Sequence, residues 1–131
     1  MKSTAAILLT VIMCFVLASC GKADPIVLPD RDNIANISVV IDGEIIYHED
    51  SAWIDCVMSG IADAEPTSKE SVHDVPQVDD YIKLDIQLYG GVSTVFAYEE
   101  DGKYYIEQPY QGIYELDSDT YSRIIELGVN K

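Results

Sequence analysis

Residues 81–116, YIKLDIQLYGGVSTVFAYEEDGKYYIEQPYQGIYEL, carry the pattern that decides the fold of this 131-residue chain. Apolar residues at positions 82, 84, 86 and 88 alternate with mostly polar ones, and a strand places such neighbours on opposite faces. One face of this strand is therefore apolar and the other half-polar, as in an antiparallel sheet with one covered face. A second strand is expected after Gly90-Gly91, from Val92 to Glu99.

Two Asp-Gly pairs predict tight hairpin turns, because a type I′ turn needs positive φ at both central positions. Asp101-Gly102 implies three cross-strand pairs: Glu100 with Lys103, Tyr98 with Tyr105, and Ala97 with Ile106. Asp42-Gly43 predicts a second hairpin between residues 37–41 and 44–48, with the implied pairs Ile41–Glu44, Val40–Ile45, Val39–Ile46 and Ile37–His48.

Two amphipathic helices complete the expected architecture. The first begins after a cap at Asp50 or Ser51 and carries an apolar stripe to about residue 61 or 64. We interpret Trp53, near its start, as a helix-on-sheet anchor rather than a ligand-stacking residue. The second helix follows Asp117 or Ser118 and stops at Gly128. The predicted fold is α+β: an antiparallel sheet of about five strands built from hairpins, with the two helices on one face.

The N-terminus has the three-part layout of a secretory signal: Lys2, an apolar run over residues 5–17, and small residues before a cysteine. Its end, LASCG at residues 17–21, is similar to the lipobox of bacterial lipoproteins. That resemblance implies cleavage between Ser19 and Cys20 and a diacylglyceryl group on Cys20. The alternative, an uncleaved membrane-spanning anchor, needs roughly 20 apolar residues, more than this run has. We predict a signal peptide at 1–19, a lipidated tether at 20–32 and a single α+β domain at 33–131.

The charge of the predicted mature chain restricts its partners. Lys2 is the one charged residue before Cys20, which leaves seven Lys and Arg against 23 Asp and Glu, a net charge of −16. Nucleic acid is excluded as a partner, because its binding needs Lys and Arg at the phosphates. Anionic lipid headgroups should also repel the domain, so the lipid on Cys20 provides the membrane attachment, and two acyl chains suffice for that.

The sequence contains no recognisable catalytic or cofactor motif, and we predict neither a cofactor nor a metal. Candidate metal ligands do not match any known spacing; they are His48, Glu49, Asp50, His73, Asp74, Asp79 and Asp80. Cys14 leaves with the signal and Cys20 is lipidated, so Cys56 is expected to be an unpaired, half-buried structural cysteine. Residues 64–80 form a long predicted loop, and such loops are either mobile or functional.

Tyrosines crowd the second half of the chain, and three of them form the candidate binding surface: Tyr105, Tyr110 and Tyr114. Tyrosine offers large contact area with a hydroxyl group at low entropic cost, which explains its enrichment in binding surfaces. The alternative is cross-strand packing on the sheet. Tyr104 and Tyr105 must face opposite ways in a strand, so at least one of them should be core.

The segment at residues 104–114, YYIEQPYQGIY, resembles a domain of unknown function found in small lipoproteins and other extracytoplasmic proteins of Gram-positive bacteria. The resemblance implies a fold and a location but no activity. We therefore predict a membrane-anchored extracytoplasmic lipoprotein that binds a protein, a peptide or an envelope polymer without catalysis. The alternatives are an extracytoplasmic hydrolase or metal-dependent enzyme with an unrecognised site, and an accessory subunit of a membrane complex.

Overall fold

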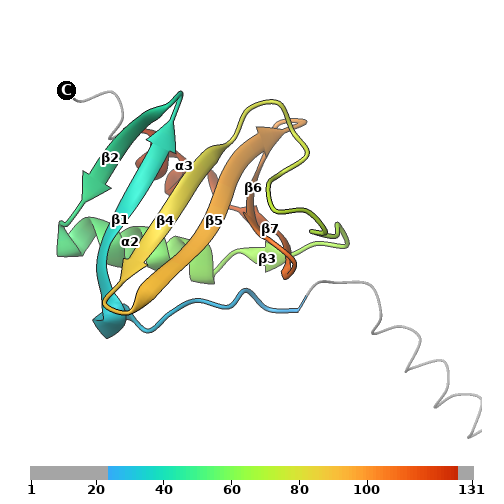
Figure 1. Cartoon of the computed structure of the whole chain (residues 1–131). Helices are drawn as coiled ribbons and strands as arrows, with labels where there is room; N and C mark the ends of the chain where they lie inside the picture. The colour runs from blue at the N-terminus through green and yellow to red at the C-terminus, as the bar shows by residue number, and fades with distance from the viewer. Residues whose placement is uncertain (1–23, 127–131) are drawn as a thin grey trace, which may run out of the picture.

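The computed structural model describes residues 24–126, which form an α+β domain with a seven-stranded antiparallel sheet and two α-helices (Figure 1). The strand order is β2-β1-β4-β5-β6-β7-β3. The elements are η1 (Arg31–Asn33), β1 (Ile34–Ile41), β2 (Glu44–His48), α2 (Ser51–Ala62), β3 (Glu65–Pro66), β4 (Ile82–Leu88), β5 (Gly91–Glu100), β6 (Lys103–Gln108), β7 (Gly112–Leu116) and α3 (Ser118–Glu126).

Both predicted hairpins are present in the predicted register. Tyr98 lies opposite Tyr105 across β5 and β6, and Ile37 lies opposite His48 across β1 and β2. The turns are made as their sequences require: φ is +50° and +82° at Asp42 and Gly43, and +53° and +77° at Asp101 and Gly102. These values are the left-handed pairs that a type I′ turn needs.

The sheet has more strands than the expected five because two further segments also pair, one after β6 and one directly after α2. Residues 112–116 form β7 against β6, although Pro109 interrupts the chain between them. Glu65 and Pro66 then add β3 to the far side of β7. Pro66 has no N–H for a ladder, which explains why this piece is short and lies at the edge of the sheet.

One face of the sheet packs against both helices, as predicted. Figure 1 shows α2 and α3 behind the sheet. One buried cluster, which we call the helix-side core, joins them to β1, β4, β5, β6 and β7. Helix α2 contributes a stripe at helical spacing: Ile54, Val57, Met58 and Ile61. The Asp50 carboxylate caps this helix by accepting a hydrogen bond from the Trp53 N–H at 2.9 Å. The Asp117 carboxylate caps α3 by accepting one from the Thr120 N–H at 2.8 Å.

Trp53 and Gly60 connect the two helices. The Trp53 ring stacks on His48 at 3.8 Å between centroids, and its indole N–H donates to the Arg123 carbonyl at 3.4 Å. Trp53 therefore anchors α2 to both β2 and α3, which agrees with its predicted role as a helix-on-sheet anchor. Gly60 lies against the Thr120 side chain, where a Cβ would come within 2.0 Å of Thr120 Oγ1. The close crossing of the helices thus depends on glycine at this position.

Residues 24–30 lie along the end of the sheet rather than away from it (Figure 1). The Gln108 side chain bonds both backbone groups of Val27: its amide donates to the Val27 carbonyl at 2.7 Å, and its oxygen accepts from the Val27 N–H at 2.9 Å. The Tyr114 hydroxyl donates to the Asp24 carbonyl. Ile26 and Leu28 pack on the helix-side core. This part of the predicted 20–32 tether is therefore joined to the domain; the predicted signal peptide and Cys20 lie outside the described residues.

Candidate functional site

The second face of the sheet is partly covered by residues 67–81, which we call the strap. The strap leaves β3, runs along the β6–β7 side of the sheet and joins β4 (Figure 1), and its Val78 packs on residues of β5, β6 and β7. It begins where the Thr67 hydroxyl and N–H both donate to the Ile113 carbonyl, at 2.7 Å and 3.1 Å. It ends where the Tyr81 ring packs edge-on against Phe96, with centroids 5.3 Å apart. The predicted long loop therefore packs against this face of the sheet at both of its ends.

Beneath the strap lies a small apolar cluster that is separate from the helix-side core. It contains Tyr98, Tyr105 and Ile113, with Val78 of the strap packed against them. The two tyrosine rings are 5.7 Å apart, as cross-strand neighbours on one face should be. Outward-facing residues of β5, β6 and β7 therefore form the floor of this cluster on the sheet, and the strap covers them.

A buried carboxylate interrupts this apolar floor. Glu107 is only 4% exposed, and its oxygens accept hydrogen bonds from the Ser71 hydroxyl at 2.7 Å and from the Tyr98 hydroxyl at 3.2 Å. Burial beside this carboxylate raises the pKa of the Tyr98 phenol, so Tyr98 remains a neutral donor. A charged group is costly to bury, and a carboxylate with two hydroxyl donors retains further acceptor sites. Glu107 is thus a buried carboxylate within a cluster that is otherwise apolar or aromatic.

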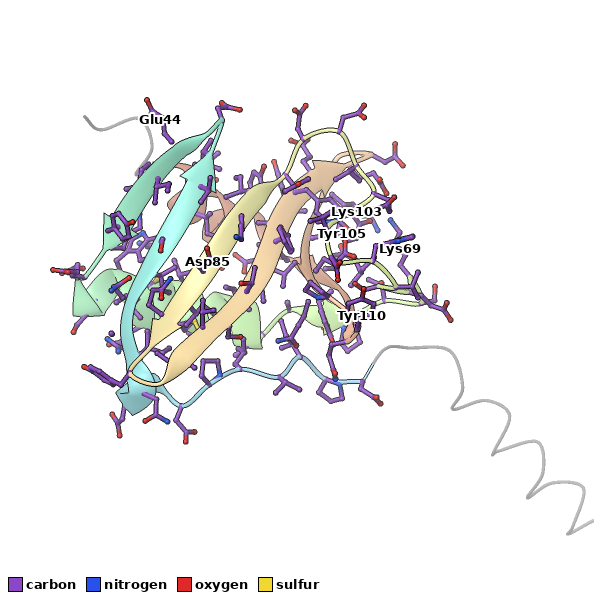
Figure 2. All side chains as sticks on the ribbon, in the orientation of Figure 1. Glu44, Lys69, Asp85, Lys103, Tyr105 and Tyr110 are labelled. Atoms are coloured by element: carbon purple, nitrogen blue, oxygen red, sulfur yellow. The ribbon has the colours of Figure 1, made fainter. Side chains whose placement is uncertain are left out.

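Lys69 places an ammonium group at the rim of the same region. Its Nζ lies 2.9 Å from Glu100 Oε1 and 4.3 Å from the centroid of the Tyr105 ring, in the geometry of a cation–π contact. The hydrogen bond to Glu100 is the main cause that raises the pKa of Lys69. Figure 2 shows Lys69, Tyr105 and Lys103 at the strap-covered side of the sheet, with Tyr110 at the turn below them.

Lys69 and Glu100 line a pocket of about 200 Å³ beneath the strap, which we call the strap pocket, and the Tyr105 ring lies next to it under the Lys69 ammonium. Its walls come from the strap and from outward-facing strand residues; they are Lys69, Glu70, Val72, His73, Gln77, Val78, Tyr98, Glu100, Glu107 and Ile113. A second depression of about 370 Å³ shares Gln77, Val78 and Glu100 with it and adds Asp79, Asp80 and Glu99. The strap pocket combines aromatic surface, a buried carboxylate and a negative rim, which suits a small cationic group.

The three tyrosines of the predicted binding surface occupy different environments. Tyr114 is fully buried in the helix-side core, and Tyr105 is 6% exposed beneath the strap. Tyr110 is 66% exposed and has a φ of +63°, and its hydroxyl donates to Asp74 at 2.7 Å. Of the three, Tyr110 is the exposed one, because the strap with its Lys69 ammonium covers Tyr105 and strand alternation turns Tyr114 inward. Tyr104 faces away from Tyr105, as predicted, and stacks on Tyr121 of α3 at 4.4 Å.

The candidate metal ligands are not brought together. His48 is buried at the end of β2, and burial lowers the pKa of its imidazole, whereas His73 is exposed on the strap. Among residues 24–126, no three His, Cys, Asp or Glu side chains are grouped so that they could hold a metal ion. Cys56 is exposed rather than half-buried, because it lies off the stripe that Ile54 and Val57 make on α2.

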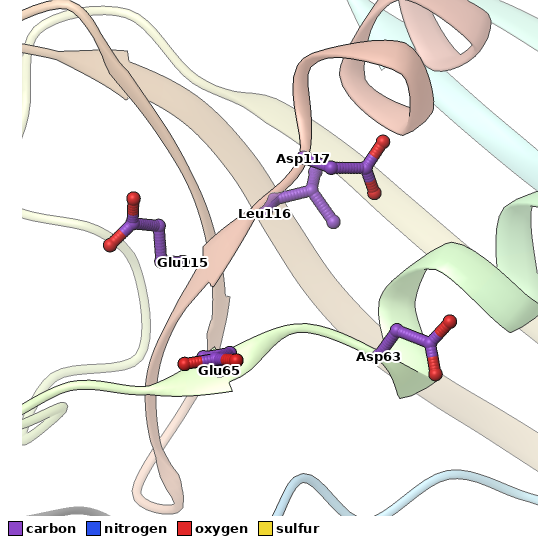
Figure 3. Close-up of a pocket in the computed structure, with 5 residues that line it drawn as sticks. All are labelled: Asp63, Glu65, Glu115, Leu116 and Asp117. Carbon is purple, nitrogen blue, oxygen red and sulfur yellow. The ribbon is translucent and has the colours of Figure 1, made fainter.

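A third depression, of about 510 Å³, lies at the β3–β7 edge and is lined by Asp63, Glu65, Glu115, Leu116 and Asp117. Glu65 and Glu115 are direct cross-strand partners, an arrangement that like charges disfavour. Figure 3 shows that the four carboxylates point in different directions rather than toward one centre. Lys103 also lies 3.8 Å from Glu115. This edge is acidic, whereas the strap pocket combines an aromatic ring, apolar side chains and a buried carboxylate, so we take the strap pocket as the candidate site.

Fold and site together define a small α+β domain whose sheet carries helices on one face and a strap with a pocket on the other. The chain belongs to the DUF5301 family, whose description is "Domain of unknown function (DUF5300)"; the family profile matches residues 22–115. The predicted resemblance to a domain of unknown function is thereby confirmed. Its restriction to lipoproteins of Gram-positive bacteria stays a prediction.

A solved structure is similar over nearly its whole length. It is described as the NMR structure of the protein from Ruminococcus gnavus, and it shares 37% sequence identity with this chain at a TM-score of 0.63. The match covers 72% of this chain and 97% of that one. No curated protein matches this chain significantly. In the described part of the chain, none of the helices combines the length and the apolar character that crossing a bilayer would require.

Proposed function

We propose that this protein is a lipid-anchored extracytoplasmic binding module that receives its partner at the strap pocket, without catalysis. One observation carries the proposal: Glu107 is buried beneath the strap, with Ser71 and Tyr98 hydroxyls on its oxygens, in a pocket that opens between strap and sheet. A carboxylate buried beside a cavity is costly to desolvate unless hydrogen bonds or a ligand compensate for the lost water, and this cost favours a functional role for Glu107.

The location rests on the N-terminal sequence. Lys2, the apolar run at 5–17 and the small residues before Cys20 support export and lipidation. Replacing Cys20 by Ser should release the protein from the membrane fraction of cells, while the unaltered chain stays there. Retention of the full-length Cys20→Ser chain would indicate an ordinary membrane anchor and would refute lipid attachment.

Site-specific cross-linking on intact cells tests the binding surface. A photoreactive residue at position 72, on the pocket wall, should form a discrete adduct; Val72 is 58% exposed. The matched control is position 92, also a valine and 55% exposed, at the other end of β5. Six residues of strand, roughly 20 Å, separate Val92 from Tyr98. Equal labelling at the two positions, or none at position 72, would contradict a partner site at the strap pocket.

A further inference from the structure

Lys69 shows which chemistry the strap pocket accepts. Its ammonium group lies over the Tyr105 ring, with Glu100 2.9 Å away on the adjacent strand. An aromatic face and a carboxylate around one ammonium form the usual receptor for an amine cation. This receptor is occupied by a side chain of the strap itself.

The surroundings of this ammonium are otherwise negative. Lys69 is the sole Lys or Arg among the described residues that line the strap pocket and the adjoining depression. The acidic residues that line them are Glu70, Asp79, Asp80, Glu99, Glu100 and Glu107. The region therefore attracts cations, and one internal ammonium leaves most of its negative charge without a counterion in the wall.

We infer that the strap pocket is a recognition site for a primary ammonium group, and that Lys69 occupies it from within the chain until a ligand ammonium replaces it. This inference rests on the proposed binding function and names its ligand class: a primary amine of the lysine side-chain type. The site consists of Tyr98, Glu100 and Glu107 in the pocket wall, together with the Tyr105 ring that lies under the Lys69 ammonium. Lys69 of the strap therefore competes with an external ammonium group for this site.

Lys69 is placed so that exchange is feasible. The Lys69 and Glu100 side chains remain 43% and 40% exposed, so water reaches their ion pair and screens it. A fully buried pair would resist such exchange, because a removed partner leaves an uncompensated charge. Lys69 is therefore a replaceable occupant rather than a fixed part of the core.

The strap also stays in place without the Lys69 ammonium. Thr67 is bonded to the Ile113 carbonyl on one side of Lys69, and Ser71 is bonded to Glu107 on the other. Val78 packs on the tyrosines, and Tyr81 packs on Phe96. Neutralising Lys69 should consequently empty the receptor without releasing the strap.

The test compares amine binding by the full-length protein in detergent micelles with and without this internal ammonium. The probe is n-butylammonium, a lysine side-chain mimic, and NMR of labelled tyrosine rings reports on Tyr98 and Tyr105. In Lys69→Gln, the probe should shift both ring signals with an apparent affinity at least about tenfold higher than in the unaltered chain, because a tethered competitor at high effective concentration has been removed. Uncharged 1-butanol should produce no such shift.

Lys103→Gln is the matched control, since Lys103 also pairs with a glutamate on this face, Glu115 at 3.8 Å. It should respond to the probe as the unaltered chain does, and adding Glu100→Gln to Lys69→Gln should abolish the gain. Equal affinity in the unaltered chain and Lys69→Gln, or an equal response to butanol, would overturn the inference. Dispersed tyrosine signals in Lys69→Gln confirm that it is folded.

Two further outcomes separate this inference from the proposed function. Cross-linking at position 72 with no ring shift in Lys69→Gln would keep the binding module and refute the ammonium ligand. A blocked Gly-Lys-Gly peptide carries the same primary ammonium on a lysine side chain, so it should also shift the Tyr98 and Tyr105 ring signals of Lys69→Gln. No shift with this peptide would overturn the lysine-type amine as the ligand class.

Discussion

Replacing Gly60 by Ala should destabilise the protein, although alanine is the better helix former. A Cβ at this position would lie 2.0 Å from Thr120 Oγ1, 2.6 Å from Cγ2 and 2.8 Å from Cβ. Rotating the Thr120 side chain relieves the first two contacts but not the third, because Cβ is fixed to the backbone of α3. Helix α3 must therefore move away from α2.

The expected size follows from two opposing effects. Alanine gains roughly 1 kcal/mol over glycine in a helix interior. Forcing extra volume into a packed contact costs about 1–3 kcal/mol. Because the contact includes a backbone-fixed atom, we place the cost near the upper end and expect a net loss of about 1–2 kcal/mol. For a domain of this size, that loss lowers the melting temperature by roughly 4–16 °C.

Calorimetry of four chains measures the effect: unaltered, Gly60→Ala, Thr120→Ala, and both together. Thr120→Ala removes Oγ1 and Cγ2, so Gly60→Ala should cost less in that background, with a coupling of about 1 kcal/mol. Gly90→Ala is the control, because a Cβ there meets nothing within 4 Å. An increase in stability for Gly60→Ala, or the same cost in both backgrounds, would refute the close helix crossing.

Three further substitutions test other parts of the fold. Burial lowers the pKa of His48 below 6.5, so the free energy of unfolding should be highest above pH 6.5 and should decrease as the pH falls toward the pKa of the folded state. His48→Phe, which keeps a ring on Trp53, should flatten this part of a plot of melting temperature against pH. Asp50→Ala should cost about 0.5–2 kcal/mol in urea unfolding, whereas Asp50→Asn, which still caps α2, should cost little. Tyr114→Phe should cost about 1 kcal/mol and speed amide exchange at Val27, because its hydroxyl bonds the Asp24 carbonyl; unchanged exchange would show that Gln108 alone retains the segment.

Local chemistry determined what could be predicted of the fold. Asp42-Gly43 and Asp101-Gly102 specify turn type and register together, so both hairpins were predicted residue by residue. The stripe through Ile54 and Ile61 specified α2. β3 was missed because two residues that include Pro66 carry no period, and their pairing depends on how the chain returns along β7.

The site was harder to predict because it depends on contacts across the sheet. The strap and the tyrosine hairpin were both singled out, but nothing in the sequence indicated that one covers the other. Alternation places Tyr98, Tyr105 and Glu107 on one face, yet it gives no sign that Ser71 approaches Glu107, 36 residues further along the chain, or that Lys69 approaches the Tyr105 ring. Glu107 was missed because one more glutamate is inconspicuous in a chain with 23 acidic residues.

On the proposed lipidation of Cys20, the attachment of residues 24–30 to the end of the sheet limits the distance between the domain and the membrane. Four peptide units link Cys20 to Asp24, and a fully extended chain of that length spans at most about 14 Å. For a chain lipidated at Cys20, the domain is held close to the bilayer. The turn that carries Gln111, whose side-chain amide donates to the Pro25 carbonyl, then lies on the side nearest the membrane. On that proposed attachment, so short a link confines any binding to partners in the layer of the envelope next to the membrane.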